Sequence, residues 1–310
     1  MAELRFDDRV AVITGGGRGL GRAYALLLAS RGAKIVVNDP GVSMSGDATD
    51  AKESDWGPAD ALVNEIKAAG GQAVASLDSV ATPEGAKAIV QTALDAFGRV
   101  DILIHSAGNV RRGLLTEIAY EDFESVLSVH LRGAFHMVRE CMPHMTAQNY
   151  GRIVLTGSIN GLYGKANNAS YALCKAGFMG LSNTAAIEGG EHGIKSNVII
   201  PAAVTRMSAG IDTSQFPPME PEMVAPAVAW LCHEDCSISG EMLVAMGGRV
   251  ARAFIAESEG VFRKDWTIEH VAGDIEAIRA AEKPLVFPPA PKGELEHLLF
   301  GFDMARKNGA

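Results

Sequence analysis

The sequence predicts an α/β protein, a doubly wound parallel sheet in a single domain with a C-terminal helical extension. Short apolar runs rich in β-branched residues alternate with longer segments of helical composition as far as Met246. A glycine-rich turn joins the first apolar run to the first helical segment. Strands and helices that alternate in this way form parallel sheets with helices on both faces and a ligand site at the carboxyl ends of the strands.

The first strand-helix-strand unit contains the glycine-rich turn. Residues 9–14 read RVAVIT and residues 34–39 read KIVVND, and both runs are typical of strands buried on both faces. Between them lie the turn GGGRGLG, at residues 15–21, and the helix-forming segment AYALLLASRGA. Glycines alone would indicate only a tight turn. Between two buried strands they put a helix N-terminus where a pyrophosphate binds, which predicts a Rossmann-type nucleotide site.

The later elements follow in the same alternation. We expect strands at residues 72–78, 100–108, 152–157, 196–201 and 241–246. We expect helices at residues 59–69, 82–97, 120–145 and 169–188, and a further helix that begins at Pro226. Pro83 suits the first position of the second of these helices.

Two segments are additional to the sheet. Residues 40–58 form a polar loop, either a solvated surface loop or a flap over the adenosine end of a cofactor. Residues 251–310 carry two apolar stripes at helical spacing and a fair N-cap at Thr267. The stripes consist of Ile268, Val271, Ile275 and Ile278, and of Leu295, Leu298, Leu299 and Phe302. Because such stripes need burial, we expect the chain from about Arg249 to pack as helices on the parent domain or on a sister subunit.

A candidate for proton transfer lies in the segment YALCK. Tyr171 and Lys175 are four residues apart and share one face of the expected helix, and Ser158 follows the strand at residues 152–157. A free tyrosine titrates near pH ~10, and a neighbouring cation can lower this pKa by roughly one to three units. Tyr171 could then exchange a proton with an alcohol or a ketone near neutral pH.

In order and spacing, these motifs resemble those of the short-chain dehydrogenase/reductase family, over residues 6–250. The resemblance rests on the TGxxxGxG turn, the YxxxK pair and the catalytic serine, at Thr14, Gly15, Gly19, Gly21, Tyr171, Lys175 and Ser158. It implies a catalytic dinucleotide-binding domain at residues 1–250 that interconverts a secondary alcohol and a ketone by hydride transfer. Ser158 would hold the substrate oxygen and Tyr171 would take its proton. Lys175 would bind the nicotinamide ribose and lower the pKa of Tyr171.

Two positions depart from the family pattern. The NNAG motif after the fourth strand reads His105-Ser106-Ala107-Gly108, which keeps the small residues beside the cofactor ribose. His130 in VHLRG stands where many members carry an asparagine that holds a proton-relay water. Two interpretations of His130 stay open: a packing residue, or a catalytic residue that keeps the relay through its side chain or its main-chain carbonyl.

The cofactor implied is NAD. Asp39 ends the second strand, where an acidic residue accepts hydrogen bonds from the adenosine ribose and repels a 2′-phosphate. Arg18, in the glycine turn, is a clue in the opposite direction. Asp78 fits a contact to the adenine, and Val204 a contact to the nicotinamide carboxamide. The cofactor-binding residues implied are Thr14, Gly15, Gly17, Arg18, Gly19, Leu20, Gly21, Asp39, Asp78, Ser79, His105, Ala107, Gly108, Tyr171, Lys175, Pro201 and Val204.

The substrate is less well defined. The stretches ALDAFGRVD, VHLRGAFH, YGRIV and LSNTAAIEG resemble the (3R)-hydroxyacyl-CoA dehydrogenase domain of peroxisomal multifunctional enzyme type 2. A (3R)-hydroxyacyl-CoA is one candidate, and a free cyclic, terpenoid or steroid alcohol is the other. Met207, Ile211 and Phe216, in the family's substrate-loop position, suit a partly apolar substrate. A non-catalytic nucleotide-sensing scaffold is a third reading, but such a scaffold would be expected to lose Tyr171 or Lys175.

Composition limits the other classes of function. The 310 residues are 47% hydrophobic with a net charge of −9, which disfavours a nucleic-acid partner. No apolar run approaches the ~20 residues of a membrane span, and no signal peptide is recognisable. Cys232, His233 and Cys236 have metal-like spacing, but no second ligand pair follows them. We expect a cytoplasmic enzyme with four reduced cysteines, no metal and a small-molecule substrate; the family resemblance implies a homodimer or homotetramer.

Overall fold

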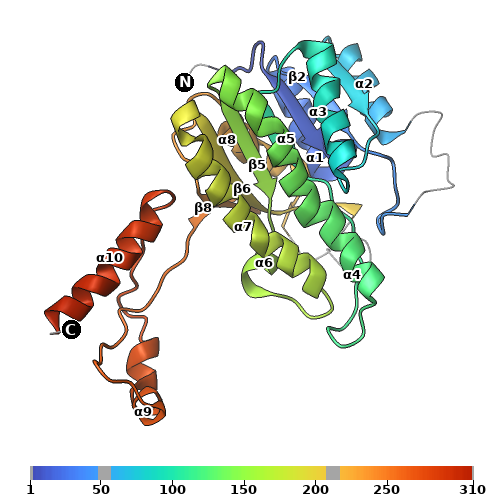
Figure 1. The fold of residues 1–310 in the computed structure, drawn as a ribbon. Helices are drawn as coiled ribbons and strands as arrows, with labels where there is room; N and C mark the ends of the chain where they lie inside the picture. The colour runs from blue at the N-terminus through green and yellow to red at the C-terminus, as the bar shows by residue number, and fades with distance from the viewer. Residues whose placement is uncertain (1–2, 48–56, 207–216, 309–310) are drawn as a thin grey trace. The chain divides into compact units, whose positions relative to one another are not determined.

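The computed structural model describes residues 3–47, 57–206 and 217–308. The chain divides into two compact units, Met1–Arg252 and Ala253–Ala310 (Figure 1). None of the described helices combines the length and the apolar character that a membrane span requires.

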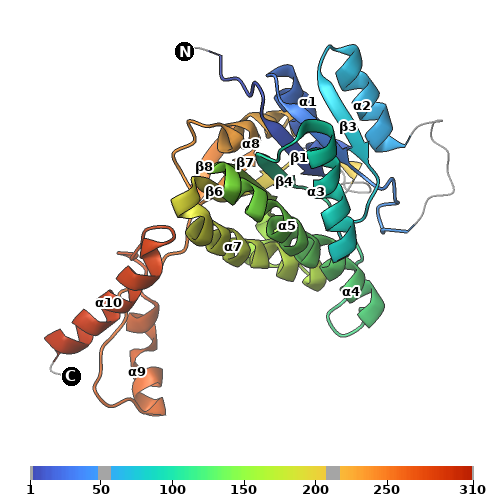
Figure 2. The same cartoon turned by 45° about the horizontal axis from the view of Figure 1, so that its top comes forward.

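Eight strands of the described chain form one sheet, in the order β3-β2-β1-β4-β5-β6-β7-β8 (Figure 2). Every neighbouring pair from β3 to β7 is parallel. The strands are β1 (Val10–Thr14), β2 (Lys34–Asn38), β3 (Gln72–Ser76), β4 (Ile102–His105), β5 (Gly151–Thr156), β6 (Ile194–Ala202), β7 (Met242–Met246) and β8 (Arg249–Ala253). The predicted α/β fold with a doubly wound parallel sheet is confirmed.

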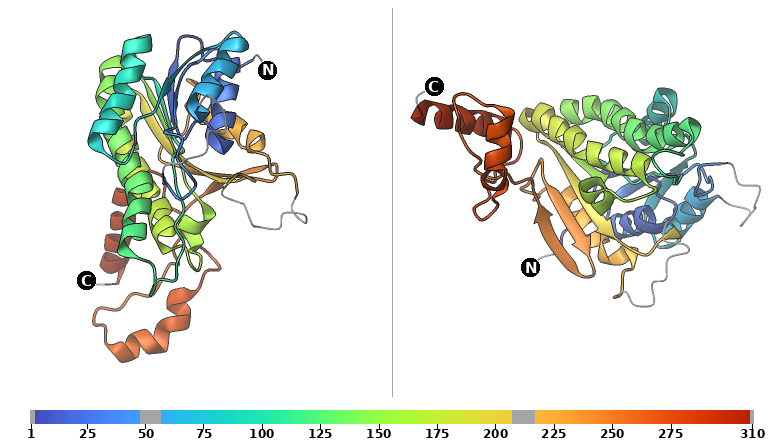
Figure 3. Two further views of the ribbon diagram at one scale, coloured as in Figure 1. Left: turned by 90° about the vertical axis from the view of Figure 1, so that its right-hand side faces the viewer. Right: turned by 90° about the horizontal axis from the view of Figure 1, so that it is seen from below.

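Helices cover both faces of this sheet (Figure 3, left). On one face, side chains of α1 (Gly19–Ser30), α2 (Pro58–Ala68) and α8 (Ala225–Cys232) share a buried core with Ile13, Ile35 and Val154 of the strands. The other face carries α3 (Pro83–Phe97), α5 (Gly133–Gln148) and α7 (Ala169–Gly189). Because both faces are covered, the strands are continuous apolar runs, which is why the sequence pattern locates them.

Two regions differ from the sequence expectation. The helical stretch expected at residues 120–145 is α4 (Tyr120–Leu127), a π-helical turn η1 (Ser128–Arg132) and then α5. The chain after Gly248, expected to begin the helical extension, instead adds β8 to the sheet beside β7. The reason is the pair Gly247 and Gly248, whose φ values of 52° and 79° reverse the chain in a tight turn.

Short elements complete the first unit. They are α6 (Ile159–Tyr163), η2 (Gly190–His192) and η4 (Pro221–Met223). The second unit contains α9 (Ile268–Arg279) and α10 (Lys292–Lys307), and neither helix has a buried side chain. Thr267 caps α9 as predicted, because its side chain accepts a hydrogen bond from the His270 N–H at 3.2 Å.

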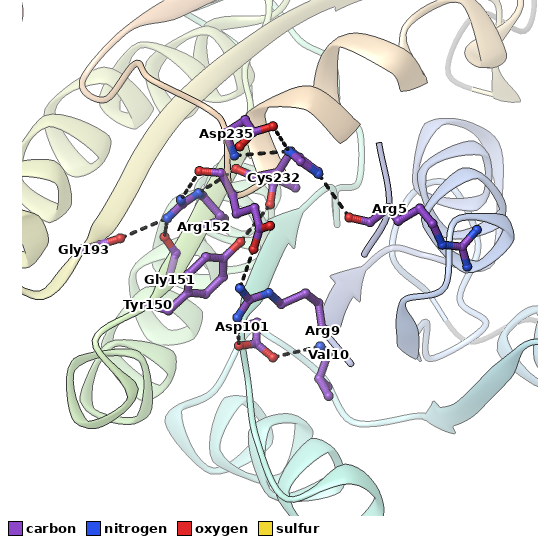
Figure 4. A network of polar contacts seen from close by, with 12 residues as sticks. Arg5, Arg9, Val10, Asp101, Tyr150, Gly151, Arg152, Gly193, Cys232 and Asp235 are labelled. Carbon is purple, nitrogen blue, oxygen red and sulfur yellow. Dashed lines mark hydrogen bonds and ion pairs between the residues drawn. The ribbon is translucent and has the colours of Figure 1, made fainter. Parts of the chain in front are cut away.

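A buried arginine ties the amino ends of β5 and β6 to the segment that follows α8 (Figure 4). Arg152 is only 4% exposed. It donates hydrogen bonds of 2.8 to 3.1 Å to the carbonyls of Gly151, Gly193, His233 and Glu234. The guanidinium groups of Arg9 and Arg152 lie 3.7 and 4.4 Å from the ring centroid of Tyr150. This cluster lies at the opposite end of β5 from Ser158 and is a structural element of the sheet.

Candidate active site

The glycine turn brings the main chain at the end of β1 against the segment after β4. A Cβ on Gly15 would lie 2.8 Å from the Ala107 Cα, and a Cβ on Gly21 would lie 2.2 Å from the Gly15 oxygen. Gly15 and Gly19 also have positive φ values of 61° and 53°. The first turn of α1 contains no acidic side chain, so the positive end of the helix dipole is left for an anion.

Asp39 stands at the end of β2 beside this turn. Its carboxylate accepts hydrogen bonds from the Gly17 N–H at 3.2 Å and the Gly41 N–H at 2.9 Å. On the neighbouring strand, the Asp78 carboxylate accepts a hydrogen bond of 3.2 Å from the Ser76 hydroxyl. Asp78 and Ser79 are exposed. The two predicted acidic residues therefore follow adjacent strands at the carboxyl edge of the sheet.

Thr14 fixes the protonation form of His105. The Thr14 hydroxyl accepts the N–H groups of Ser106 and Ala107, both at 3.2 Å, and lies 3.0 Å from Nδ1 of His105. The single hydroxyl proton is therefore donated to Nδ1, so the neutral imidazole carries its own proton on Nε2. Burial, assisted by the charge of Lys175, lowers the pKa of His105 to about 3. His105 is a neutral link between the glycine turn and β4.

Ser158, Tyr171 and Lys175 come together where β5 ends. Ser158 is the N-cap of α6, and its hydroxyl accepts the Asn160 N–H at 3.2 Å. Tyr171 and Lys175 lie on α7, and the Tyr171 phenol lies close enough to Ser158 for that side chain to oppose the rise of the phenol pKa. Lys175 is 7% exposed and its ammonium donates to the Thr156 carbonyl at 2.7 Å.

The effect of Lys175 on Tyr171 differs from the sequence expectation. Burial raises the pKa of Tyr171, and the opposing influence is the side chain of Ser158. The Lys175 Nζ lies 5.5 Å from the centroid of the phenol ring and is bound to the Thr156 carbonyl. Burial also lowers the pKa of Lys175 to about 7. In this arrangement the structure does not show the predicted lowering of the Tyr171 pKa by the lysine.

His130 lies on the π turn, with its ring against Tyr171 of α7. The ring is buried, and Nε2 lies 2.8 Å from the Asn109 carbonyl and 3.1 Å from the Asn109 N–H. A Cβ on Gly108 would lie 2.4 Å from Cε1 of His130, so only glycine fits there. Burial and the charge of Lys175 hold the pKa of His130 well below its usual value. The ring is therefore buried and neutral, and both the packing role and the relay role remain predictions.

Arg18 is the N-cap of α1 and Leu20 lies in its first turn, whereas the predicted residues Pro201 and Val204 lie at or near the end of β6. Pro201 is in β6, and Val204 donates its N–H to the Met219 carbonyl at 2.7 Å. Met207, Ile211 and Phe216, the predicted substrate-loop residues, lie outside the described residues. Two residues of this region were not predicted, because they belong to no sequence motif. Asn109 binds His130, and Arg111 binds Asp47 in the loop after β2.

The cysteines and histidine with metal-like spacing serve the fold. The His233 ring lies 3.1 Å from the Arg5 carbonyl and accepts the Asp235 N–H at 3.1 Å. Cys232 and Cys236 are buried, with free thiols. Among the residues that the structure describes, no three side chains of metal-binding type gather in one place.

Comparison with known proteins places this geometry in a family. Residues 9–215 match the short chain dehydrogenase family. The chain is 44% identical over 259 residues to the peroxisomal multifunctional enzyme type 2 of Drosophila melanogaster. This aligned region covers 83% of this chain and 42% of that protein. It is 42% identical over 272 residues to a putative short-chain type dehydrogenase/reductase of Mycobacterium tuberculosis, covering 86% of this chain and 92% of the relative. The chain thus spans under half the length of the Drosophila enzyme.

A solved structure agrees with these relatives. The crystal structure of a short chain dehydrogenase from Mycobacterium avium has a TM-score of 0.76 and 33% identity, covering 92% of this chain and 98% of that one. The resemblance read from the motifs is confirmed. The chain belongs to the short-chain dehydrogenase/reductase family, oxidoreductases that act on CH–OH groups and use a nicotinamide nucleotide.

Proposed function

We propose that the chain is an NAD-dependent oxidoreductase that reversibly interconverts a secondary alcohol and a ketone. The observation that carries this proposal is the meeting of Ser158, Tyr171 and Lys175 at the end of β5. The same edge of the sheet holds a turn in which Gly15 and Gly21 leave no room for a side chain, and a helix N-terminus without acidic residues, which fits a dinucleotide.

The roles of the three residues follow from their surroundings. Tyr171 exchanges a proton with the substrate oxygen. Ser158 holds that oxygen with its hydroxyl hydrogen, while one of its two lone pairs accepts the Asn160 N–H. Lys175 provides a buried positive charge and further N–H donors for a ribose. When bound, NAD provides the hydride acceptor. General acid–base catalysis of this kind contributes typically ~10² to 10⁴ in rate.

Asp39 supports NAD over NADP. Its carboxylate is held beside the glycine turn by two main-chain N–H groups, so its charge stays fixed at the end of β2. A fixed carboxylate accepts hydrogen bonds from ribose hydroxyls and repels a 2′-phosphate.

The substrate class that we favour is a (3R)-hydroxyacyl-CoA, because the chain resembles the multifunctional enzymes. The test is a turnover screen with NAD, in which hydroxyacyl-CoAs and free cyclic alcohols are compared by NADH absorbance. Higher kcat/KM for the hydroxyacyl-CoAs supports this class, whereas higher values for cyclic alcohols assign the other substrate. Absence of NADH formation with every alcohol would contradict the proposed reaction.

We also propose a homodimer or homotetramer in the cytoplasm. A cavity of about 330 Å³ on the outer surface of the first unit is lined by Leu131, Arg132, Phe135 and Leu181. Phe135 is 52% exposed, and a large apolar side chain on such a surface favours contact with another subunit. Light scattering tests the assembly. Imaging of a fluorescent fusion separates the cytoplasm from the peroxisome, which the names of some relatives mention.

A further inference from the structure

The loop after β2 is fastened to the segment after β4. The Val110 N–H donates to the Met44 carbonyl at 2.9 Å. The Arg111 guanidinium donates to the Ser45 carbonyl at 2.8 Å and to the Asp47 carboxylate at 2.7 Å. We name residues 43–47 the strap, and Arg111 is the residue that holds it in place.

The strap has a defined conformation of its own. The Ser43 and Ser45 hydroxyls lie 2.8 Å apart, and Ser45 donates to Asp47 at 2.6 Å. Gly46 has a φ of 91°, and a Cβ there would lie 2.8 Å from the Asn109 side-chain nitrogen. The strap therefore contacts the segment after β4 in two ways: Gly46 packs closely against Asn109, and Asp47 pairs with Arg111.

Sheet topology defines what the strap crosses. β1 lies between β2 and β4, so a segment that leaves β2 and binds Val110 and Arg111 must pass the carboxyl end of β1. The glycine turn lies at that end. The two ends of the long loop also meet there, because a Cβ on Gly41 would lie 3.3 Å from Pro58, and a Cβ on Gly17 would lie 2.8 Å from the same proline.

A bound nucleotide must follow the same route. In the proposed function it reaches from Asp39, after β2, to Lys175, whose ammonium meets the end of β5 at Thr156. With β1 and β4 between these strands, the nucleotide passes the same strand ends as the strap. We infer that the strap retains the bound nucleotide and that Arg111 sets its release rate as a positioning residue. This inference rests on the proposed cofactor site.

The interactions of Arg111 are weak enough for the strap to open and close over a bound nucleotide. Its side chain is 27% exposed and that of Asp47 is 64% exposed, so the ion pair is partly screened by solvent and salt. Arg111 also lies 3.5 Å from Asp122 on α4. Loss of Arg111 removes both ion pairs and the bond to the strap carbonyl, while leaving the strands intact.

The test is the release rate of NADH, measured by stopped-flow displacement with fluorescence detection. We expect Arg111→Ala to increase the dissociation rate about tenfold and Arg111→Lys to increase it less, because affinity changes of this kind fall mainly on dissociation. Asp47→Asn should also accelerate release. The matched control is Arg112→Ala, since Arg112 is the exposed neighbour and forms no ion pair within the described chain. This control should change the rate less than twofold.

Salt provides a second measurement. Sodium chloride should accelerate NADH release from the wild-type protein and have little further effect on Arg111→Ala, because the ion pairs are already absent. If the wild-type protein does not bind NADH, the proposed cofactor site is wrong. If NADH binds, but dissociates from Arg111→Ala and Asp47→Asn at the same rate as from Arg112→Ala and the wild type, the strap inference is overturned. The cofactor site then still stands.

Discussion

The imidazole of His130 stands edge-on to the phenol of Tyr171, with 5.3 Å between the ring centroids and 82° between the ring planes. The π turn carries His130 to this position, and the main chain of Asn109 holds its Nε2. The ring also packs against Gly108, in the segment that follows β4. His130 therefore supports one side of the proposed acid–base group.

This contact gives a prediction that separates the two interpretations of His130. Both His130→Ala and His130→Asn should lower kcat about three- to tenfold, because either change removes the ring that supports Tyr171, and aromatic pairs contribute about 0.5 to 1.5 kcal/mol. Steady-state kinetics measures the effect. Wild-type kcat in His130→Asn would show instead that the main-chain carbonyl, which the substitution retains, is sufficient.

Tyr171→Phe tests the acid–base assignment directly. The substitution removes the transferable proton and keeps the ring, so turnover should be lost while NADH binding stays close to the wild-type affinity. Fluorescence titration and steady-state kinetics give the two values. The assignment fails if the variant keeps more than about a tenth of the wild-type kcat.

Lys175→Met should stabilise the protein at low pH. Burial lowers the pKa of Lys175 from 10.5 to about 7, so the folded state binds fewer protons than the unfolded state between these values. The free energy of unfolding of the wild type therefore rises with pH across this window, and the full cost of the buried charge is present below pH 7. That cost is at most about 5 kcal/mol, less about 1 kcal/mol for the lost bond to Thr156.

Urea unfolding at pH 6 and pH 9 measures the gain in stability. We expect Lys175→Met to be about 2 to 4 kcal/mol more stable than the wild type at pH 6 and to lose part of this advantage at pH 9. Lys165→Met, at an exposed lysine, is the control and should change stability little at either pH. A Lys175→Met variant less stable than the wild type at pH 6 would contradict the buried charge.

Asp39→Ala should shift cofactor preference toward NADP. The change removes hydrogen bonds to a ribose and relieves repulsion of a 2′-phosphate, so the ratio of kcat/KM for NADP to that for NAD should rise at least about tenfold. Side-by-side kinetics with both cofactors decides the matter. A wild-type enzyme that already prefers NADP would make Arg18 the determining residue. Because Asp39→Ala also removes the hydrogen bond from the Gly17 N–H, the melting temperature of the variant is measured to check that the fold is retained.

Removal of residues 254–310 should change assembly or substrate range more than cofactor binding. The cut follows β8 and spares the sheet, while it removes α9 and α10, whose apolar stripes have no buried residue. Light scattering and kinetics on the full chain and the truncation provide the test. A full-length monomer with kinetics unchanged by truncation would remove any role for the extension in assembly or catalysis.

The sequence predicts those features that depend on neighbouring residues. The strand Val10–Thr14, the glycine turn and the cap at Thr82, which accepts the Gly85 N–H at 3.1 Å, are local patterns with one structural solution. The pairing of Tyr171 with Lys175 on one helix also follows from their spacing. Ser158 joins them because β5 and α7 pack together in the expected fold.

Features that depend on distant residues were not predictable. The π turn at His130 has no composition signal that separates it from the helices on either side. The bond of Arg111 to Asp47 joins residues sixty-four positions apart, and nothing in either local sequence indicates the partner. The predicted direction of the Tyr171 pKa shift was wrong because burial, which the sequence does not give, raises the pKa more than Ser158 lowers it.

The Arg152 cluster has a consequence for how this protein can change over time. Arg152 fastens the amino ends of β5 and β6 to the segment after α8 with four hydrogen bonds to carbonyl groups, whereas the proposed chemistry lies at the carboxyl ends of the strands. Substitutions around the substrate can therefore accumulate without weakening that anchor, since sites without shared partners contribute to stability almost additively. A scaffold of this kind tolerates mutation at one end of its sheet while the other end maintains the fold, which favours new substrate specificities on an old framework.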